Sequence, residues 1–325
     1  MASTAAAPPL VSMVVTTYRA VDHLSCLVRG LLRTPPSADL EVVLYGDGGG
    51  EASRAAIAAC QEALRQAGHR VVAHYQPANR GIVPALNAGC RLATGRWLLV
   101  VNDDMVFADG WLAAVRPALA PGRVVSLTCA EPPLPGRRVA AVFHARDLGL
   151  DPAAFDFEGL QRFCREAPGE GLVGGVNYPF LVERARFEEV GGADERFPGP
   201  YHDPDLFLRL KLRGLELLRL RRCLVYHFSG VSLRFSTQGP DAGALAASAR
   251  KSAGWVRKEH DARLLFVAKW GAKPRAVFGE VPRTRALAPW ADAPHGPGAQ
   301  LAYRALLGWE WTRCRLRELS RRLRG

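Results

Sequence analysis

Apolar runs alternate with alanine-rich stretches through the first third of the chain. The apolar runs hold β-branched residues with few polar interruptions, which is typical of strands buried on both faces. The alanine-rich stretches space their apolar residues as a helix does. The pattern predicts strands at Val11–Thr16, Leu40–Tyr45, Arg70–Tyr75 and Trp97–Asn102, separated by helices at Val21–Arg33, Glu51–Ala67 and Ile82–Ala93.

Strands that alternate with helices of this length form βαβ units. We therefore expect an α/β fold with a doubly wound, mostly parallel sheet and flanking helices on both faces. Gly68 and Gly95 fall where two of the helices should end, since glycine readily adopts the left-handed conformation of a helix C-cap.

The alternation changes after about residue 120. Two short strands are predicted near Val124–Thr128 and Val139–His144, followed by a surface excursion at 147–171. A second ordered block over 171–230 contains a predicted helix at Asp203–Arg213.

The last part of the chain has its own character. A Pro/Gly-rich stretch at 288–298 precedes a helix predicted at Leu301–Arg324. The changes of pattern divide the chain into a domain over 1–232 and a basic, partly helical C-terminal region over 233–325.

The formal net charge of +12 is concentrated near the C-terminus. Residues 250–325 hold 17 Lys and Arg against 6 Asp and Glu, whereas residues 1–249 hold 26 against 25. Hydrophobic residues make up 48% of the chain and charged residues 23%, as in ordinary globular proteins. The chain therefore combines a near-neutral body with a basic C-terminal part.

The sequence carries no recognisable targeting or cross-linking signal. The N-terminus lacks a basic segment followed by a long apolar stretch, and no apolar run approaches the roughly 18 residues that a membrane span requires. The seven cysteines are scattered without a CxxC pair, which argues against a zinc cage and a disulfide framework. These features predict a cytoplasmic protein with buried or incidental thiols.

The fourth predicted strand ends directly on Asn102, Asp103 and Asp104. In an open parallel sheet, ligands bind beyond the carboxyl ends of the strands. Three oxygen-bearing side chains there suit Mg²⁺ or Mn²⁺, and such an ion could bind a diphosphate. A turn in which an aspartate caps the next helix is the alternative.

Other acidic residues and one histidine also stand at the ends of predicted elements. Asp47 lies in a glycine-rich turn, where it could bond to a base or a ribose; a Rossmann fingerprint is excluded because Glu51 replaces its last glycine. Asp203 and Asp205 begin a helix, where a carboxylate can cap the helix or act as a general base. His227 ends a strand-like run and could ligate a metal or pack in the core.

Taken in order, these motifs resemble the family 2 glycosyltransferases of GT-A fold. The order is a strand ending in TTY, a strand ending in GDG, then NRGIVPALNAGCRLATG, VVNDDM, GGADERF, YHDPDLFLRLKLRG and VYHFSG. The resemblance covers roughly residues 11–232, with seven motifs in the family's order and spacing. It implies a nucleotide-sugar half over about residues 10–120 and an acceptor half over about residues 121–232.

The resemblance implies a donor site. Thr16, Thr17 and Tyr18 match the segment that meets the nucleobase and ribose, and Asp47 matches the acid that contacts the base. The NxG…NxG element and the DxD motif add Asn79, Gly81, Asn87, Gly89, Asn102 and Asp103.

The resemblance also implies a metal and a catalytic base. Mn²⁺ or Mg²⁺ would be held by Asp104 with Asn102 and His227. Asp203 matches the acid of the ED motif, which is the base in members that invert the anomeric centre. Residues expected to bind the acceptor or support the site are His202, Asp205, Gly174 and Gly175.

The implied activity is an inverting, metal-dependent transfer of a hexosyl or deoxyhexosyl group in glycan biosynthesis. The donor would be a nucleoside-diphosphate sugar, and the acceptor a hydroxyl of a glycan, a lipid-linked sugar or a small natural product. Four positions depart from the family pattern. Gly46 replaces the first acid of DDGS, Leu86 an Arg that many members have near the diphosphate, Asn102 the first Asp of DxD and His202 the Glu of ED. Asp104 and Asp203 are kept, so we expect an active enzyme.

The predicted C-terminal helix has an apolar stripe. Trp309, Leu316 and Leu323 stand seven apart with Leu319 on the same side, and arginines fill the opposite face. The segment 301–324 could attach peripherally to the inner face of an anionic membrane. Alternatively, the stripe packs on the catalytic domain or on a second subunit, as in a homodimer. The segment FVAKWG also resembles one found after the catalytic domain in family members.

Two other classes of protein compete with this interpretation. One is a catalytically silent nucleotide-sugar-binding protein, or a protein whose basic tail binds membrane or nucleic acid. The tail lacks RRM, KH and zinc-finger signatures, so no specific nucleic acid is expected. The other is a sugar-nucleotide nucleotidyltransferase, which would want a glycine-rich, basic phosphate loop after the first strand, where TTYRAVDHL stands instead.

Overall fold

The structure is a computed structural model that describes residues 9–133, 139, 143–167, 169–228, 253–270 and 297–323. Half of the strand predicted at Val139–His144 (residues 140–142) and most of the Pro/Gly-rich stretch at 288–298 lie outside these residues. In the described part of the chain, no helix is long and apolar enough to cross a membrane.

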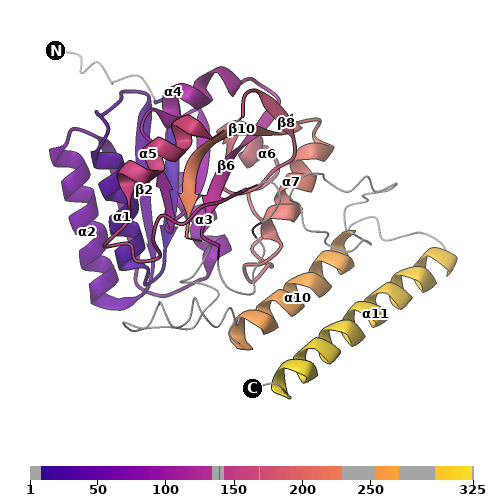
Figure 1. Ribbon diagram of the computed structural model, residues 1–325. Helices are drawn as coiled ribbons and strands as arrows, with labels where there is room; N and C mark the ends of the chain where they lie inside the picture. The colour runs from indigo at the N-terminus through magenta and orange to yellow at the C-terminus, as the bar shows by residue number, and fades with distance from the viewer. Residues whose placement is uncertain are drawn as a thin grey trace, which may run out of the picture.

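A single twisted sheet runs through the centre of the molecule (Figure 1). Its strand order is β3-β2-β1-β4-β9-β6-β10-β5, with β7 beside β6 and β8 beside β10. The strands are β1 Val11–Thr17, β2 Leu40–Asp47, β3 Arg70–Gln76, β4 Trp97–Asn102, β5 Met105–Phe107, β6 Arg123–Glu131, β7 His144–Ala145, β8 Leu172–Gly174, β9 Phe180–Glu183 and β10 Glu216–His227.

Helices cover both faces of the sheet, and two further helices lie side by side at one end (Figure 1). The helices are α1 Val21–Leu32, α2 Gly50–Gln66, α3 Ile82–Leu92, α4 Trp111–Val115 with the 3₁₀ turn Arg116–Ala118, α5 Phe157–Glu166, α6 Arg184–Glu189, α7 His202–Leu212, α10 Ala253–Trp270 and α11 Pro297–Arg322.

Side chains of each central strand alternate between two cores. Val42 and Leu44 of β2 pack with α1 and α2, whereas Val43 between them packs in the opposite core. That second core also contains buried side chains of α3, α7 and α10. Because both faces are covered, the central strands are almost wholly apolar, which is why periodicity alone located them. The predicted α/β class, with its flanking helices and helical C-terminal extension, is confirmed.

The structure corrects three details. β3 is half-buried rather than buried on both faces, because it is the edge strand of the sheet. The surface excursion expected at 147–171 contains α5, which begins where Asp156 accepts a hydrogen bond from the Gly159 N–H at 2.7 Å. The helix α10 was not predicted, although it buries Phe266 and Trp270 in the second core.

Parallel pairing brings the polar ends of several strands to one edge. Thr16 of β1 is level with Asn102 of β4, and Thr17 is level with Gly46 of β2. β10 runs parallel to β6 and antiparallel to β5, which places His227 opposite Met105. The chemistry-bearing residues of the sequence motifs therefore follow the carboxyl ends of neighbouring strands.

Gly46 has no room for a side chain, which explains one departure from the family pattern. A Cβ atom there would lie 2.2 Å from Ile57 Cδ1 and 2.9 Å from Tyr75 Cδ2. We expect Gly46→Ala to lower the free energy of unfolding by about 1–3 kcal/mol through overpacking, as measured by urea denaturation. Gly254→Ala on α10, where a Cβ meets nothing within 4 Å, is the control and should not destabilise the protein. Equal stability of both variants would contradict this packing.

Candidate active site

The ends of β1 and β4 are joined through Asp103. Its carboxyl group bonds with the Thr17 side chain and with the backbone of Tyr18. Burial and, after it, the neighbouring charge of Asp104 raise the pKa of Asp103 to about 8, because the hydrogen bonds oppose this shift only in part. Thr16 is half-buried and Tyr18 is exposed, so this end of β1 borders solvent.

Asp47 fastens the loop before α3. Its two carboxylate oxygens accept the backbone N–H groups of Arg80 at 2.9 Å and Gly81 at 2.8 Å. Gly81, the N-cap of α3, has φ 100°, a conformation that suits glycine. The neighbouring Gly48 lies so close to Asn79 that a Cβ would stand 2.9 Å from its nitrogen. The structure thus brings Asp47, Asn79 and Gly81 together, while contact of Asp47 with a base stays a prediction.

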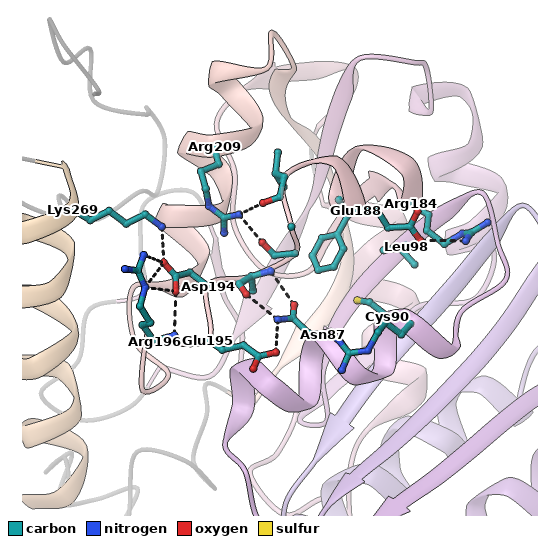
Figure 2. A pocket seen from close by; sticks show the side chains of 16 residues that line it. Asn87, Cys90, Leu98, Arg184, Glu188, Asp194, Glu195, Arg196, Arg209 and Lys269 are labelled. Atoms are coloured by element: carbon teal, nitrogen blue, oxygen red, sulfur yellow. Dashed lines mark hydrogen bonds and ion pairs between the residues drawn. The ribbon is translucent and has the colours of Figure 1, made fainter. Parts of the chain in front are cut away.

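Asn87, predicted to lie beside the donor, uses its side-chain amide to bind the loop before α7. Its Nδ2 donates to Ala193 O at 2.8 Å and to Glu195 Oε1 at 2.9 Å, and its Oδ1 accepts the Ala193 N–H at 2.9 Å. Figure 2 shows this amide in a cavity of about 600 Å³, lined also by Asp194, Arg209 and other residues of the α6–α7 region. Asn87 therefore anchors the GGADERF loop with its whole amide. Of the predicted site residues, it alone lines this cavity.

Asp104, His227 and Glu131 form a buried cluster at the carboxyl edge. His227 Nε2 lies 3.3 Å from Asp104 Oδ1, and His227 Nδ1 lies 2.9 Å from Glu131 Oε1. The Phe228 N–H donates to the Asp104 carbonyl at 3.0 Å, which continues the pairing of β10 with β5. The register of β6 and β10 brings Glu131 to the same place. Two carboxylates and one imidazole are thus fixed by sheet pairing.

The charge of the cluster shifts the pKa of His227. Burial alone would lower it, but the charge and hydrogen bond of Asp104 and those of Glu131 raise the pKa to about 9. The Glu131 carboxylate accepts a hydrogen bond from the Nδ1–H group, which turns Nε2 toward Asp104. This carboxylate–histidine arrangement is the one that orients metal-ligating histidines in proteins.

A divalent cation fits between Asp104 and His227. A carboxylate oxygen and an imidazole nitrogen converge there, and Asn102 follows directly at the end of β4. Among the described residues, no group of three or more His, Cys, Asp and Glu side chains is arranged to hold a metal. Two protein ligands nevertheless suit Mg²⁺ or Mn²⁺, which are often bound by one or two side chains with substrate phosphates and water.

Asp203 stands in the first turn of α7, half-exposed. The preceding Tyr201 is the N-cap and has φ 67°, which is uncommon for a residue other than glycine. The Tyr178 hydroxyl lies 2.9 Å from His202 Nε2, and burial with the charge of Asp203 raises the pKa of Tyr178 well above its ordinary value. The Cys129 thiol contacts the Tyr178 carbonyl at 3.5 Å, so the start of α7 is linked to the end of β6.

The four residues expected to bind the acceptor or support the site are buried or lie away from the end of β10. Asp205 is completely buried and His202 nearly so, which makes both unavailable to an acceptor in this conformation. Gly174 pairs with Leu218, several residues before the His227 end of β10, and Gly175 bonds to Leu217 there. Support of the site is the role that remains for Asp205 and His202.

Two residues of the cluster were missed from the sequence. Glu131 ends β6 at the same edge as Asp104, and the rule that points to strand ends would have found it. His23 of α1 is half-buried near Asp104 and His227: burial lowers its pKa, whereas the charge of Asp104 opposes that shift. No sequence pattern marks His23, because a lone histidine on a helix carries no local signal.

Residues 12–131 match the family model described as glycosyl transferase family 2. The match includes every predicted residue from Thr16 to Asp104, and it confirms the family resemblance found in the sequence. This part of the chain is therefore similar to the family 2 glycosyltransferases, and the similarity supports a glycosyltransferase as the class of enzyme. None of the curated proteins matches the chain in sequence.

Solved structures share the fold. S. aureus TarS 1-349 in complex with UDP-GlcNAc is similar with a TM-score of 0.54 and 14% identity, over 82% of this chain and 67% of that one. The mannosyltransferase PcManGT from Pyrobaculum calidifontis, in complex with GDP-Man and Mn2+, is similar with a TM-score of 0.50 and 17% identity, over 96% and 88%. At these identities, the similarity shows the fold alone.

Glu131→Gln should lower the pKa of His227 from about 9. The Glu131 charge favours the imidazolium form, so its removal makes the proton easier to lose. NMR titration of the histidine ring protons in metal-free buffer measures the change. His69, whose pKa burial alone lowers, is the internal control and should not move. An unchanged His227 pKa would show that Glu131 does not set its charge.

Proposed function

We propose that the protein transfers a sugar from a nucleoside-diphosphate sugar to an acceptor hydroxyl, with metal assistance and with inversion at the anomeric carbon. The observation that carries this proposal is the Asp104–His227 pair at the carboxyl edge of the sheet, held by Glu131. The family match over residues 12–131 supports it. TarS in complex with UDP-GlcNAc and PcManGT in complex with GDP-Man have a similar fold, which favours a nucleotide-sugar donor.

Asp104 and His227 would hold Mn²⁺ or Mg²⁺, with Asn102 beside them. When bound, such an ion neutralises the charge that develops on a departing diphosphate. Glu131 would keep the proton of His227 on Nδ1, so that Nε2, once it has lost its own proton, could bind the ion. The end of β1, from Thr16 to Tyr18, borders the same edge and would contact the nucleoside.

Asp203 would take the proton of the acceptor hydroxyl. The oxygen then forms a bond to the anomeric carbon while the bond to the diphosphate breaks, and the nucleoside diphosphate leaves with the electron pair. Attack on the face opposite the leaving group inverts the centre. The first turn of α7 favours the carboxylate form of Asp203, because the helix dipole is positive there. Proton removal by a positioned base typically contributes about 10²–10⁴-fold in rate.

Thermal shifts with UDP-, GDP-, dTDP- and CDP-sugars, each with Mn²⁺ or with EDTA, test the donor site. Ligand that binds only the native state raises its stability, by about 2.7 kcal/mol at a hundredfold excess over Kd. We expect a metal-dependent shift with one nucleotide, its loss in Asp104→Ala, and its retention in Asp203→Asn. Absence of a shift with every donor would contradict a preformed donor site and would favour a protein without transferase activity or one that binds its donor only after its acceptor.

Measurements of turnover distinguish the role proposed for Asp203 from the role proposed for Asp104. With the matching donor, release of nucleoside diphosphate in the presence of acceptor extracts should fall about 10²–10⁴-fold in Asp203→Asn while donor affinity is kept. Asp104→Ala should lose donor affinity as well. Full activity of both folded variants would overturn the mechanism, and NMR of the product's anomeric proton would decide between inversion and retention.

The acceptor lies at a membrane in this proposal, because α11 carries an uncovered apolar face. Among the described residues of α11 and the one after it, six large apolar side chains are each more than half exposed: Leu301, Trp309, Trp311, Leu316, Leu319 and Leu323. The opposite side faces α10 and buries Glu310 and Cys314. Exposed arginines border the stripe at 304, 315 and 317. Tryptophan and leucine flanked by arginine suit an anionic lipid surface, where each basic residue adds about 1 kcal/mol.

Vesicle sedimentation tests this attachment. The protein should bind phosphatidylglycerol-containing vesicles, should bind phosphatidylcholine vesicles weakly, and should be released by high salt. Trp309→Glu with Leu316→Glu should abolish binding, whereas Leu212→Glu, an equally exposed leucine at the end of α7, should not. If the wild type ignores vesicles but forms a dimer that the double variant disrupts, a second copy covers the stripe and the membrane proposal is wrong.

A further inference from the structure

The catalytic base proposed above is flanked by two residues that α10 holds. Tyr201 lies two residues before Asp203, and Asp205 lies two residues after it. α10 comes from the C-terminal region, about 50 residues or more further along the chain. By holding Tyr201 and Asp205, α10 can fix the position of Asp203 without touching Asp203 itself.

Asp205 is a buried carboxylate whose partners come largely from α10. Trp270 Nε1 donates to Asp205 Oδ1 at 2.9 Å, and Lys269 Nζ lies 2.7 Å from the same oxygen. Arg209 Nε of α7 donates to Oδ2 at 2.9 Å. The side chain has no solvent exposure, so the ion pair is not screened by water. A buried charge that loses a partner is costly, and this cost keeps α10 on the start of α7.

Lys269 also reaches the loop that leads into α7. Its Nζ lies 2.6 Å from Asp194 Oδ2, which Arg196 holds as well (Figure 2). Burial would raise the pKa of Asp194, but the hydrogen bonds from Arg196 and Lys269 outweigh it and lower that pKa well below its ordinary range. One ammonium group therefore joins both ends of the segment from Asp194 to Asp205.

Tyr201 is held from the other side of Asp203. Arg263 Nη2 of α10 donates to the Tyr201 hydroxyl at 2.8 Å, and its guanidinium lies 5.6 Å from the ring centroid. The Phe266 ring is 6.3 Å from the same ring. These contacts stabilise a residue whose φ of 67° is unfavourable for tyrosine. Backbone in such a conformation persists only when its surroundings hold it.

We infer that Arg263, Lys269 and Trp270 of α10 are positioning residues for Asp203, so that the C-terminal region is part of the catalytic apparatus. This inference rests on the proposed function of Asp203. It assigns a role to the KW pair of FVAKWG, which the catalytic motifs leave unexplained. A displacement of about 1 Å at a reacting group can cost on the order of 10²-fold in rate, so loss of these contacts should reduce turnover strongly.

Conservative variants test the inference without removing the packing of α10. Trp270→Phe removes the indole N–H, Tyr201→Phe removes the hydroxyl that Arg263 binds, and Lys269→Met removes the charge. We expect each to lower kcat at least about 10-fold while the donor Kd, measured by metal-dependent thermal shift, stays within twofold. Lys258→Met, an exposed lysine on the same helix, is the control and should match the wild type.

Combination with Asp203→Asn distinguishes positioning from general weakening. If α10 acts through Asp203, adding Trp270→Phe or Lys269→Met to Asp203→Asn should lower kcat less than twofold further. Full, multiplicative losses in the double variants would show a structural role and overturn the inference. Wild-type kcat in Trp270→Phe, Tyr201→Phe and Lys269→Met, with Asp203→Asn inactive, would overturn it while leaving the proposed function intact. Wild-type kcat in Asp203→Asn would overturn the base assignment and this inference together.

Discussion

Burial of carboxylates is the constraint around which this protein is arranged. Asp47, Asp103, Asp104, Glu131 and Asp205 are all at most 6% exposed. A buried carboxyl group needs hydrogen-bond donors or an opposite charge, and each of these five finds them in a segment other than its own. One holds the loop before α3, one joins β1 to β4, two enclose the imidazole at the end of β10, and the last holds α10. Buried carboxyl groups thus stabilise the arrangement of the sheet edge, and one of them, Asp205, also binds the C-terminal region.

The same constraint explains why the site is rigid where metal would bind and more open where an acceptor would enter. His227 is enclosed by strands β5 and β6 on either side of β10, and its two carboxylate neighbours follow from their register. Asp203, by contrast, is half-exposed at a helix start. Its position depends on neighbours two residues away on each side rather than on sheet pairing. Such a division suits a donor site that is preformed and a base that must meet a variable acceptor.

The sequence was sufficient for the elements whose pattern is local. The strands and helices up to Asn102 were predicted to within about two residues, because burial on both faces leaves continuous apolar runs. The DxD and His227 positions followed from motif order. The partners of Asn87 lie 106 and 108 residues away, and those of Trp270 lie 65 residues away, so no local pattern reveals them. α5 was missed because its short amphipathic face shows only a few apolar positions.

The contacts of α10 connect the start of α7 with the C-terminal helix α11. Arg263 bonds to Tyr201, two residues before the proposed base Asp203, and its Nη1 lies 3.6 Å from the buried Glu310 of α11. If these contacts couple the start of α7 to the packing of α10 and α11, linkage applies. A ligand that stabilises the start of α7 then stabilises the packed position of the two helices by the same factor. An acceptor that engages Asp203 would thereby strengthen the hold of α11, and a surface that captures α11 would ready the base. Such coupling would link membrane or partner binding at α11 to acceptor binding at Asp203, and a C-terminal region that did not contact the start of α7 could not provide it.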